Sequence, residues 1–133
     1  MRLCACLGVA MDIIEPCGFL LSDRNFRRAG MDYQGEMIRH EGWEAFRSRL
    51  RGRLLLLTTR AALPYTDFTF EPADTLMVGR ESAGVPDSVH EAASARLLIP
   101  MRPGMRSINV AQAAAMVLGE ALRQTRLFPG GPL

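Results

Sequence analysis

Polar or glycine-bearing segments follow three short apolar runs of this chain, and their residue types suit the binding of a small polar ligand. The apolar runs read as strands ending at Leu57, Val78 and Ile99. Two glycines and a proline follow the second run and surround one carboxylate, Glu81. A stiff loop follows the third run and leads into the first turn of a helix, where backbone groups point outward. We expect the three segments to line one ligand site.

The elements that must position these segments alternate between strand and helix. Because the strands are continuously apolar and are separated by helices, the sequence predicts an α/β fold, with a mostly parallel sheet covered by helices on both faces. Ligands of such sheets bind beyond the carboxyl ends of the strands. A polar stretch at 31–42 has no clear period, and 64–72 reads as irregular. Strands are predicted at 9–14, 54–57, 75–78 and 96–99, and helices at 1–7, 22–28, 43–50, shortly after Pro86, and 108–126.

Length and composition indicate a single domain, 1–133, without a membrane span. The chain is 48% hydrophobic and 23% charged, and no apolar run approaches the roughly 20 residues that a bilayer requires. We expect a cytoplasmic protein, since no secretory signal is recognisable. The formal net charge of +2 excludes a broadly basic nucleic-acid coat.

All 16 cationic residues are arginines, which fits either phosphate binding or simply a GC-rich genome. Arg24, Arg27 and Arg28 form a candidate patch for an RNA backbone, although a solvated helix face would have the same sequence.

The cysteines and histidines do not form a metal site. Cys4, Cys6 and Cys17 are odd in number and lack a C-x-x-C spacing, so neither a disulfide framework nor a zinc site is predicted. His40 and His90 stand in polar surroundings without a nearby nucleophile, and we expect both at the surface rather than in catalysis.

The last predicted helix is unusually poor in side-chain volume. Gly119 costs roughly 1 kcal/mol relative to alanine inside a helix, which indicates that another backbone comes close. That neighbour is either an element of the same chain or a second copy in a dimer. The small residues are Ala111, Ala113, Ala114, Ala115, Gly119 and Ala121.

In the order and spacing of its motifs the whole chain resembles the SpoU branch of the SPOUT RNA methyltransferases. Within that branch it is most similar to the bacterial tRNA 2′-O-ribose methyltransferases that act on a cytidine or uridine at the anticodon wobble position. Each motif alone is weak, but together they are fairly specific. The matching segments are 14–19, 27–33, 57–60, 79–86, 99–110 and 120–124.

The resemblance implies a fold with a C-terminal trefoil knot, an exception to the rule that chains do not thread their own loops. It also implies S-adenosylmethionine as cofactor, tRNA as substrate and a homodimer as the assembly, with no metal and no membrane. Its cofactor-binding positions fall on Leu57, Gly79, Gly84, Ile99, Met101 and Ser107. Its active-site positions fall on Arg2, Glu81 and Asn109.

Methyl transfer from a sulfonium suits these residue types. The methyl group needs little activation, so an enzyme must mainly align the nucleophilic oxygen and help to remove its proton. Gly79 lets the backbone approach a ligand where a Cβ would collide. A guanidinium such as that of Arg2 would favour the alkoxide of a ribose hydroxyl or recruit a phosphate as proton acceptor.

Plainer roles are open for the same residues. Gly79 and Gly84 can serve turn geometry alone, Ser107 can be only a helix N-cap, and Glu81 can pair with a surface arginine.

The front of the chain departs from the family pattern. About the first eighteen residues of the pattern, including a strand and an Asn-x-Gly-x-x-x-Arg motif, have no counterpart except Arg2. We therefore expect an N-terminally truncated SPOUT domain. The alternative to an active methyltransferase is an inactive SPOUT module that binds S-adenosylmethionine or RNA weakly, or only dimerises.

Overall fold

The computed structural model describes residues 2–15, 37–79, 85–105 and 108–130. The chain divides into two compact units. The first unit consists of Met1–Leu50 together with Phe128–Leu133, and the second unit is Arg51–Leu127. The predicted helix at 22–28, with Arg24, Arg27 and Arg28, lies outside the described residues.

The first unit contains a short parallel pair of strands between two short helices. Its elements are α1 (Arg2–Leu7), β1 (Met11–Ile14), β2 (Met37–His40) and α3 (Trp43–Arg47). Helix α1 ends as predicted at Gly8, which has a φ of +66° and so takes the left-handed conformation typical after a helix. In the parallel pair Met11 lies opposite Met37 and Ile14 opposite His40.

Strand β2 was not predicted, and its last residue corrects a second expectation. His40 is only 6% exposed instead of lying at the surface. Its Nε2 lies 2.7 Å from Oδ1 of Asp12 on β1, and its ring meets Phe46 edge-on at 5.3 Å. The polar residues in 37–40 made this strand look like a surface segment. His40 can nevertheless be buried there, because Asp12 satisfies its ring nitrogen.

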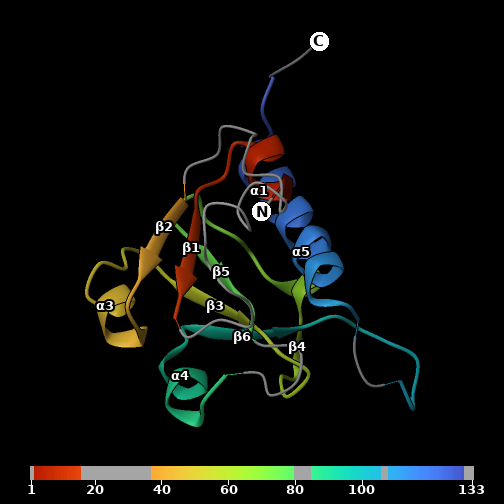
Figure 1. Cartoon of the computed structure of the whole chain (residues 1–133). Helices are drawn as coiled ribbons and strands as arrows, with labels where there is room; N and C mark the ends of the chain where they lie inside the picture. The colour runs from red at the N-terminus through yellow and green to blue at the C-terminus, as the bar shows by residue number, and fades with distance from the viewer. Residues whose placement is uncertain (1, 16–36, 80–84, 106–107, 131–133) are drawn as a thin grey trace. The chain divides into compact units, whose positions relative to one another are not determined.

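The second unit is built on a four-stranded sheet in the order β4-β6-β3-β5, and every recorded pairing is parallel (Figure 1). This confirms the mostly parallel α/β fold. The strands are β3 (Leu54–Leu57), β4 (Leu63–Pro64), β5 (Thr75–Met77) and β6 (Ala95–Leu98), and the helices are η1 (Tyr65–Asp67), α4 (Asp87–Ala92) and α5 (Val110–Thr125).

Both faces of β3 are buried, as expected for a central parallel strand. Leu55 packs with Phe70, Leu97 and Val117, so helix α5 covers this face of the sheet. Leu54 and Leu56, which alternate with Leu55 along the strand, are also fully buried. Continuous leucines at 54–57 therefore fill two layers of the same unit.

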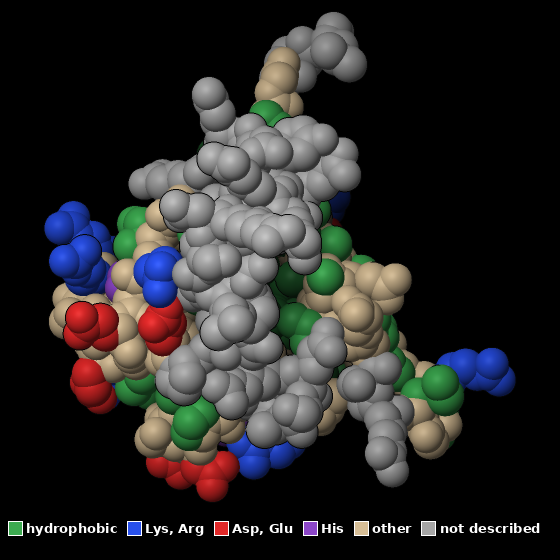
Figure 2. All heavy atoms as spheres, in the orientation of Figure 1, with side chains coloured by type: hydrophobic (Ala, Val, Ile, Leu, Met, Phe, Trp, Pro, Cys, Tyr) green, Lys and Arg blue, Asp and Glu red, His purple; other side chains and the backbone are tan. Residues whose placement is uncertain are grey.

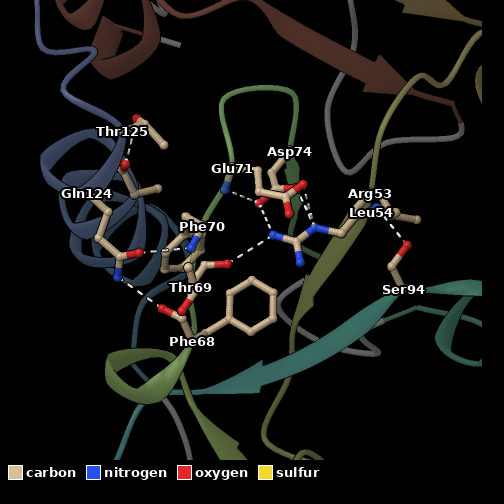
Figure 3. Close-up of polar contacts among 11 residues, drawn as sticks. Arg53, Leu54, Phe68, Thr69, Phe70, Glu71, Asp74, Ser94, Gln124 and Thr125 are labelled. Carbon is tan, nitrogen blue, oxygen red and sulfur yellow. Dashed lines mark hydrogen bonds and ion pairs between the residues drawn. The ribbon is translucent and has the colours of Figure 1, made fainter.

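A polar cluster holds the amino ends of β3 and β5 together (Figure 3). The guanidinium of Arg53 donates to both carboxylate oxygens of Asp74, at 2.8 and 2.7 Å, and lies 4.8 Å from the centre of the Phe68 ring. Gly52, with a φ of +80°, allows this approach, because a Cβ there would lie 2.4 Å from the Ala73 carbonyl oxygen.

Helix α5 is fixed near its end by the side-chain amide of Gln124 (Figure 3). Its Oε1 accepts from the Phe70 backbone N–H at 2.8 Å, and its Nε2 donates to the Phe68 carbonyl at 2.9 Å. One side chain thus satisfies two backbone groups of the segment that follows η1.

The described residues bear on two further expectations, the neighbour of Gly119 and the placement of His90. A Cβ at Gly119 would meet no heavy atom within 4 Å there, so no backbone of this part of the chain approaches it. His90 is half-buried rather than at the surface, and its Nε2 is buried without a hydrogen-bond partner among the described residues. Within the same ranges no helix is long and apolar enough to cross a membrane, and no three metal-ligating side chains gather.

Positive and negative side chains occur together on the face drawn in Figure 2. Figure 2 shows arginine and carboxylate side chains interspersed over the described residues of the drawn face. This matches the small net charge of +2.

Candidate active site

The carboxyl ends of three neighbouring strands lie at one edge of the second unit's sheet. Leu56 of β3 lies opposite Met77 of β5, and Leu57 lies opposite Leu97 of β6. The backbone N–H of Thr58 extends the ladder by donating to the Leu97 carbonyl at 2.9 Å. Because all three strands are parallel, the segments that follow them start side by side, as the sequence predicted.

The described residues at this edge offer apolar surface that is only partly covered. Val78 is 38% exposed, and Leu57, Gly79, Ile99 and Met101 are half-buried. Apolar side chains next to a glycine without a Cβ suit a flat organic group that is also contacted by the backbone.

Asn109 forms the N-cap of α5. Its Oδ1 accepts from the backbone N–H of Ala111 at 2.9 Å and of Gln112 at 3.4 Å. The carbonyl oxygen of the side chain is therefore committed to the helix, and the amide NH₂ is the part left for a ligand. Ser107, for which the sequence leaves an N-cap role open, lies outside the described residues.

Arg60 also lies at this edge, although sequence reasoning assigned it no role. It follows β3 in a turn in which Thr58 Oγ1 accepts from the Arg60 backbone N–H at 3.1 Å. Both terminal nitrogens of its guanidinium lie 3.4 Å from Oδ1 of Asp87, at the start of α4. The signal in the sequence was an arginine three residues after a buried strand, but no pattern showed where its side chain would extend.

The remaining predicted site residues do not enter this geometry. Glu81, Gly84 and Ser107 lie outside the described residues. Arg2 is the first residue of α1 and belongs to the other compact unit. Their roles stay predictions.

Strong electrostatic perturbation is found at other places in the second unit. Hydrogen bonds from Arg123 and Gln124 lower the pKa of Glu120, on α5, to about 2. Asp74, whose pKa is also lowered, lies at the amino end of β5. Neither carboxylate lines the carboxyl edge of the sheet.

A parallel sheet with ligand-binding loops at its carboxyl edge is shared by many enzymes, and the comparison with known families is more specific. The model of the SpoU rRNA Methylase family matches residues 1–119. The chain belongs to this family, which confirms the resemblance found in the sequence.

Individual relatives agree with this assignment. A tRNA (cytidine(34)-2'-O)-methyltransferase from Beijerinckia indica is 64% identical over 129 residues, which cover 93% of this chain and 81% of the relative. A protein of the same name from Ancylobacter novellus is 53% identical over 132 residues, covering 96% of this chain and 84% of the relative.

A solved structure also matches the fold closely. It concerns the 2-OH methylation of C/U34 on tRNA, and it is 36% identical with a TM-score of 0.85. The match covers 92% of this chain and 83% of that one.

Proposed function

We propose that this chain transfers the methyl group of S-adenosylmethionine to the ribose 2′-hydroxyl of nucleotide 34, the wobble position of a tRNA anticodon. The observation that carries the proposal is the 64% identity, over 93% of the chain, to a tRNA (cytidine(34)-2'-O)-methyltransferase. The match in fold to the structure concerned with C/U34 supports the same substrate class.

The residues at the carboxyl edge fit the cofactor. An adenosine has a flat apolar face and polar edges, and the edge offers half-buried Leu57 and Ile99, Val78 at 38% exposure and Gly79 without a side chain. When bound, S-adenosylmethionine supplies an activated methyl group. In our proposal Leu57, Gly79, Ile99 and Met101 hold it, together with Gly84 and Ser107.

The remaining work of the chain is to align the ribose and handle its proton. The Asn109 amide NH₂ can donate to an oxygen of the bound substrate, since its carbonyl oxygen is held by the helix. Glu81 contributes a polar group in the segment after β5, and Arg2 favours loss of the hydroxyl proton.

Further parts of the proposal concern the architecture. Residues 1–133 act as one SPOUT domain with a C-terminal trefoil knot, and two copies form a homodimer in the cytoplasm. No described residue comes within 4 Å of a Cβ at Gly119, and the small residues around it on α5 suit close approach by the backbone of a partner.

Two measurements test the activity. S-adenosylhomocysteine should bind in calorimetry and raise the melting temperature, because a ligand that binds only the folded state stabilises it. A full-length tRNA should accept a radiolabelled methyl group, whereas the same tRNA with a 2′-deoxynucleotide at position 34 should accept none.

The outcomes separate the alternatives. Binding of S-adenosylhomocysteine without methyl transfer to any tRNA would identify an inactive SPOUT module. Equal labelling of the 2′-deoxy tRNA would place the methyl group at another site and refute the proposed target.

A further inference from the structure

Arg60 extends a cation from the carboxyl edge of the sheet into solvent. It lies three residues beyond the end of β3, and its side chain is 57% exposed. The bond from its backbone N–H to Thr58 Oγ1 fixes the turn, so the side chain leaves the edge at a defined point.

The one ion pair of Arg60 in the described structure is too weak to explain the residue. Both guanidinium nitrogens lie 3.4 Å from a single oxygen of Asp87, whose side chain is 87% exposed. Exposed pairs of this kind contribute little or nothing to stability. Arg53, by contrast, binds both oxygens of Asp74 at 2.8 and 2.7 Å.

Two further arginines of the same unit, Arg96 and Arg123, are already engaged by neighbouring groups. Arg96 donates to the backbone carbonyls of His90 and Ala93 at 3.0 and 3.3 Å. Arg123 binds both oxygens of Glu120 at 2.8 Å each. The Arg60 guanidinium, in contrast, can exchange its partner at little cost in free energy.

We infer that Arg60 binds a backbone phosphate of the RNA substrate and that Asp87 occupies its guanidinium while RNA is absent. This inference rests on the proposed function. A guanidinium can bind two phosphate oxygens at once. In the pair with Asp87, both guanidinium nitrogens share one carboxylate oxygen instead. The phosphate therefore replaces Asp87 when RNA reaches the carboxyl edge.

The carboxylate of the cofactor is the competing source of a negative oxygen. The exposure of Arg60 and its reach toward α4 favour a polymer that passes over the surface. A charged backbone contact also has a signature that a cofactor contact lacks, because it releases counterions from the nucleic acid.

The test measures tRNA affinity by fluorescence anisotropy over a range of salt concentrations, on the full chain. Arg60→Ala should weaken binding about fivefold to tenfold and reduce the slope of log affinity against log salt by about 0.7–0.9. Arg60→Lys should retain the slope but bind less tightly than the wild type. The matched control is Arg51→Ala, because Arg51 is an exposed arginine before the amino end of the same strand.

Asp87→Asn tests the exchange. Freeing Arg60 should tighten tRNA binding about twofold, and this gain should disappear in the double variant with Arg60→Ala. The affinity for S-adenosylhomocysteine should be the same in all these variants.

Three results would overturn the inference. They are a tRNA affinity and salt slope of Arg60→Ala equal to those of Arg51→Ala, a loss of S-adenosylhomocysteine affinity instead of tRNA affinity, or an Asp87→Asn gain that persists without Arg60. If the wild type methylates tRNA while any of these holds, only the role of Arg60 fails. A wild type that binds no tRNA would overturn the proposed function and the inference together.

Discussion

Asn109 combines a structural and a proposed chemical role in one side chain, and the two roles use different atoms. The carbonyl oxygen caps α5, while the amide NH₂ remains available. A substitution that keeps one of these groups and removes the other can therefore separate stability from activity.

We expect Asn109→Ala to lose both functions and Asn109→Asp to lose only the donor. The alanine variant should be destabilised by about 1 kcal/mol, while aspartate caps as well as asparagine. Methyl transfer should fall roughly a hundredfold in both, the scale of losing one aligned donor. Urea unfolding and single-turnover methylation measure the two effects, and an active Asn109→Asp would refute the donor role.

Asp74 is the carboxylate through which acid should weaken the second unit. Burial, with the side chain 5% exposed, acts to raise its pKa, but hydrogen bonds from Arg53 and from the Glu71 backbone N–H outweigh it. The pKa therefore lies below its ordinary value of 3.8. A group with a lowered pKa stabilises the fold above its ordinary pKa and loses that contribution as the pH falls through the folded-state value.

Asp74→Asn should accordingly be less stable than the wild type at neutral pH, and the difference should shrink as the pH falls below about 4. Thermal unfolding followed by circular dichroism at several pH values would measure this. Asp67→Asn, at an exposed position in η1, is the control and should keep the wild-type profile. A constant difference between Asp74→Asn and the wild type at all pH values would contradict the assignment.

At the scale of elements, helix α5 depends on Gln124 for its attachment to the chain after η1. Gln124→Leu keeps the approximate size but leaves the Phe70 N–H and the Phe68 carbonyl without their partner (Figure 3). Each lost bond to a part-buried backbone group costs about 1–3 kcal/mol.

We therefore expect Gln124→Leu to lower the free energy of unfolding by about 2–6 kcal/mol, measured by urea denaturation. Gln112→Leu, the same change at an exposed position of the same helix, should change it by less than about 0.5 kcal/mol. Equal effects at the two positions would show that the Gln124 bonds add no net stability.

Helices and strands could be predicted from the sequence where their apolar residues follow a regular pattern, such as a continuous run or a helical spacing. Leu54–Leu57 matches the predicted strand, and α5 begins at Val110 within two residues of its predicted start. Strand β2 was missed because Arg39 and His40 give it neither an apolar run nor an alternating pattern. The polar partner of His40 is Asp12, which lies 28 residues away in the sequence, so a local pattern could not predict the contact.

The candidate site was predictable to the same degree. Strand ends at Leu57, Val78 and Ile99 could be identified because the runs are apolar, and their meeting at one edge follows from parallel pairing. The cap at Asn109 and the reach of Arg60 toward Asp87 required coordinates, because each depends on side-chain direction.

At the scale of the whole molecule, stability of the second unit is concentrated in one apolar cluster. Leu55, Leu97 and Val117 are each 0% exposed and come from two strands and α5. Removing volume at their meeting point should weaken every element that contributes to it.

Leu55→Ala should reduce the free energy of unfolding by about 2–5 kcal/mol, because it leaves a cavity in a fully buried layer. Leu63→Ala removes the same atoms from a residue that is 38% exposed, and it should lower the free energy of unfolding much less. Chemical denaturation of both variants measures the contrast, and a Leu63→Ala loss as large as that of Leu55→Ala would argue against this core.

The strand order β4-β6-β3-β5 governs when the second unit can assemble during translation. Strand β6 is the last to be synthesised, yet it lies between β3 and β4, and Val117 of α5 must follow to close the core. A nascent chain that has emerged only as far as β5 lacks the strand that joins the two sides of the sheet. Its leucine-rich β3 remains uncovered until β6 and α5 have been synthesised, so we expect this unit to fold only after α5 has emerged from the ribosome.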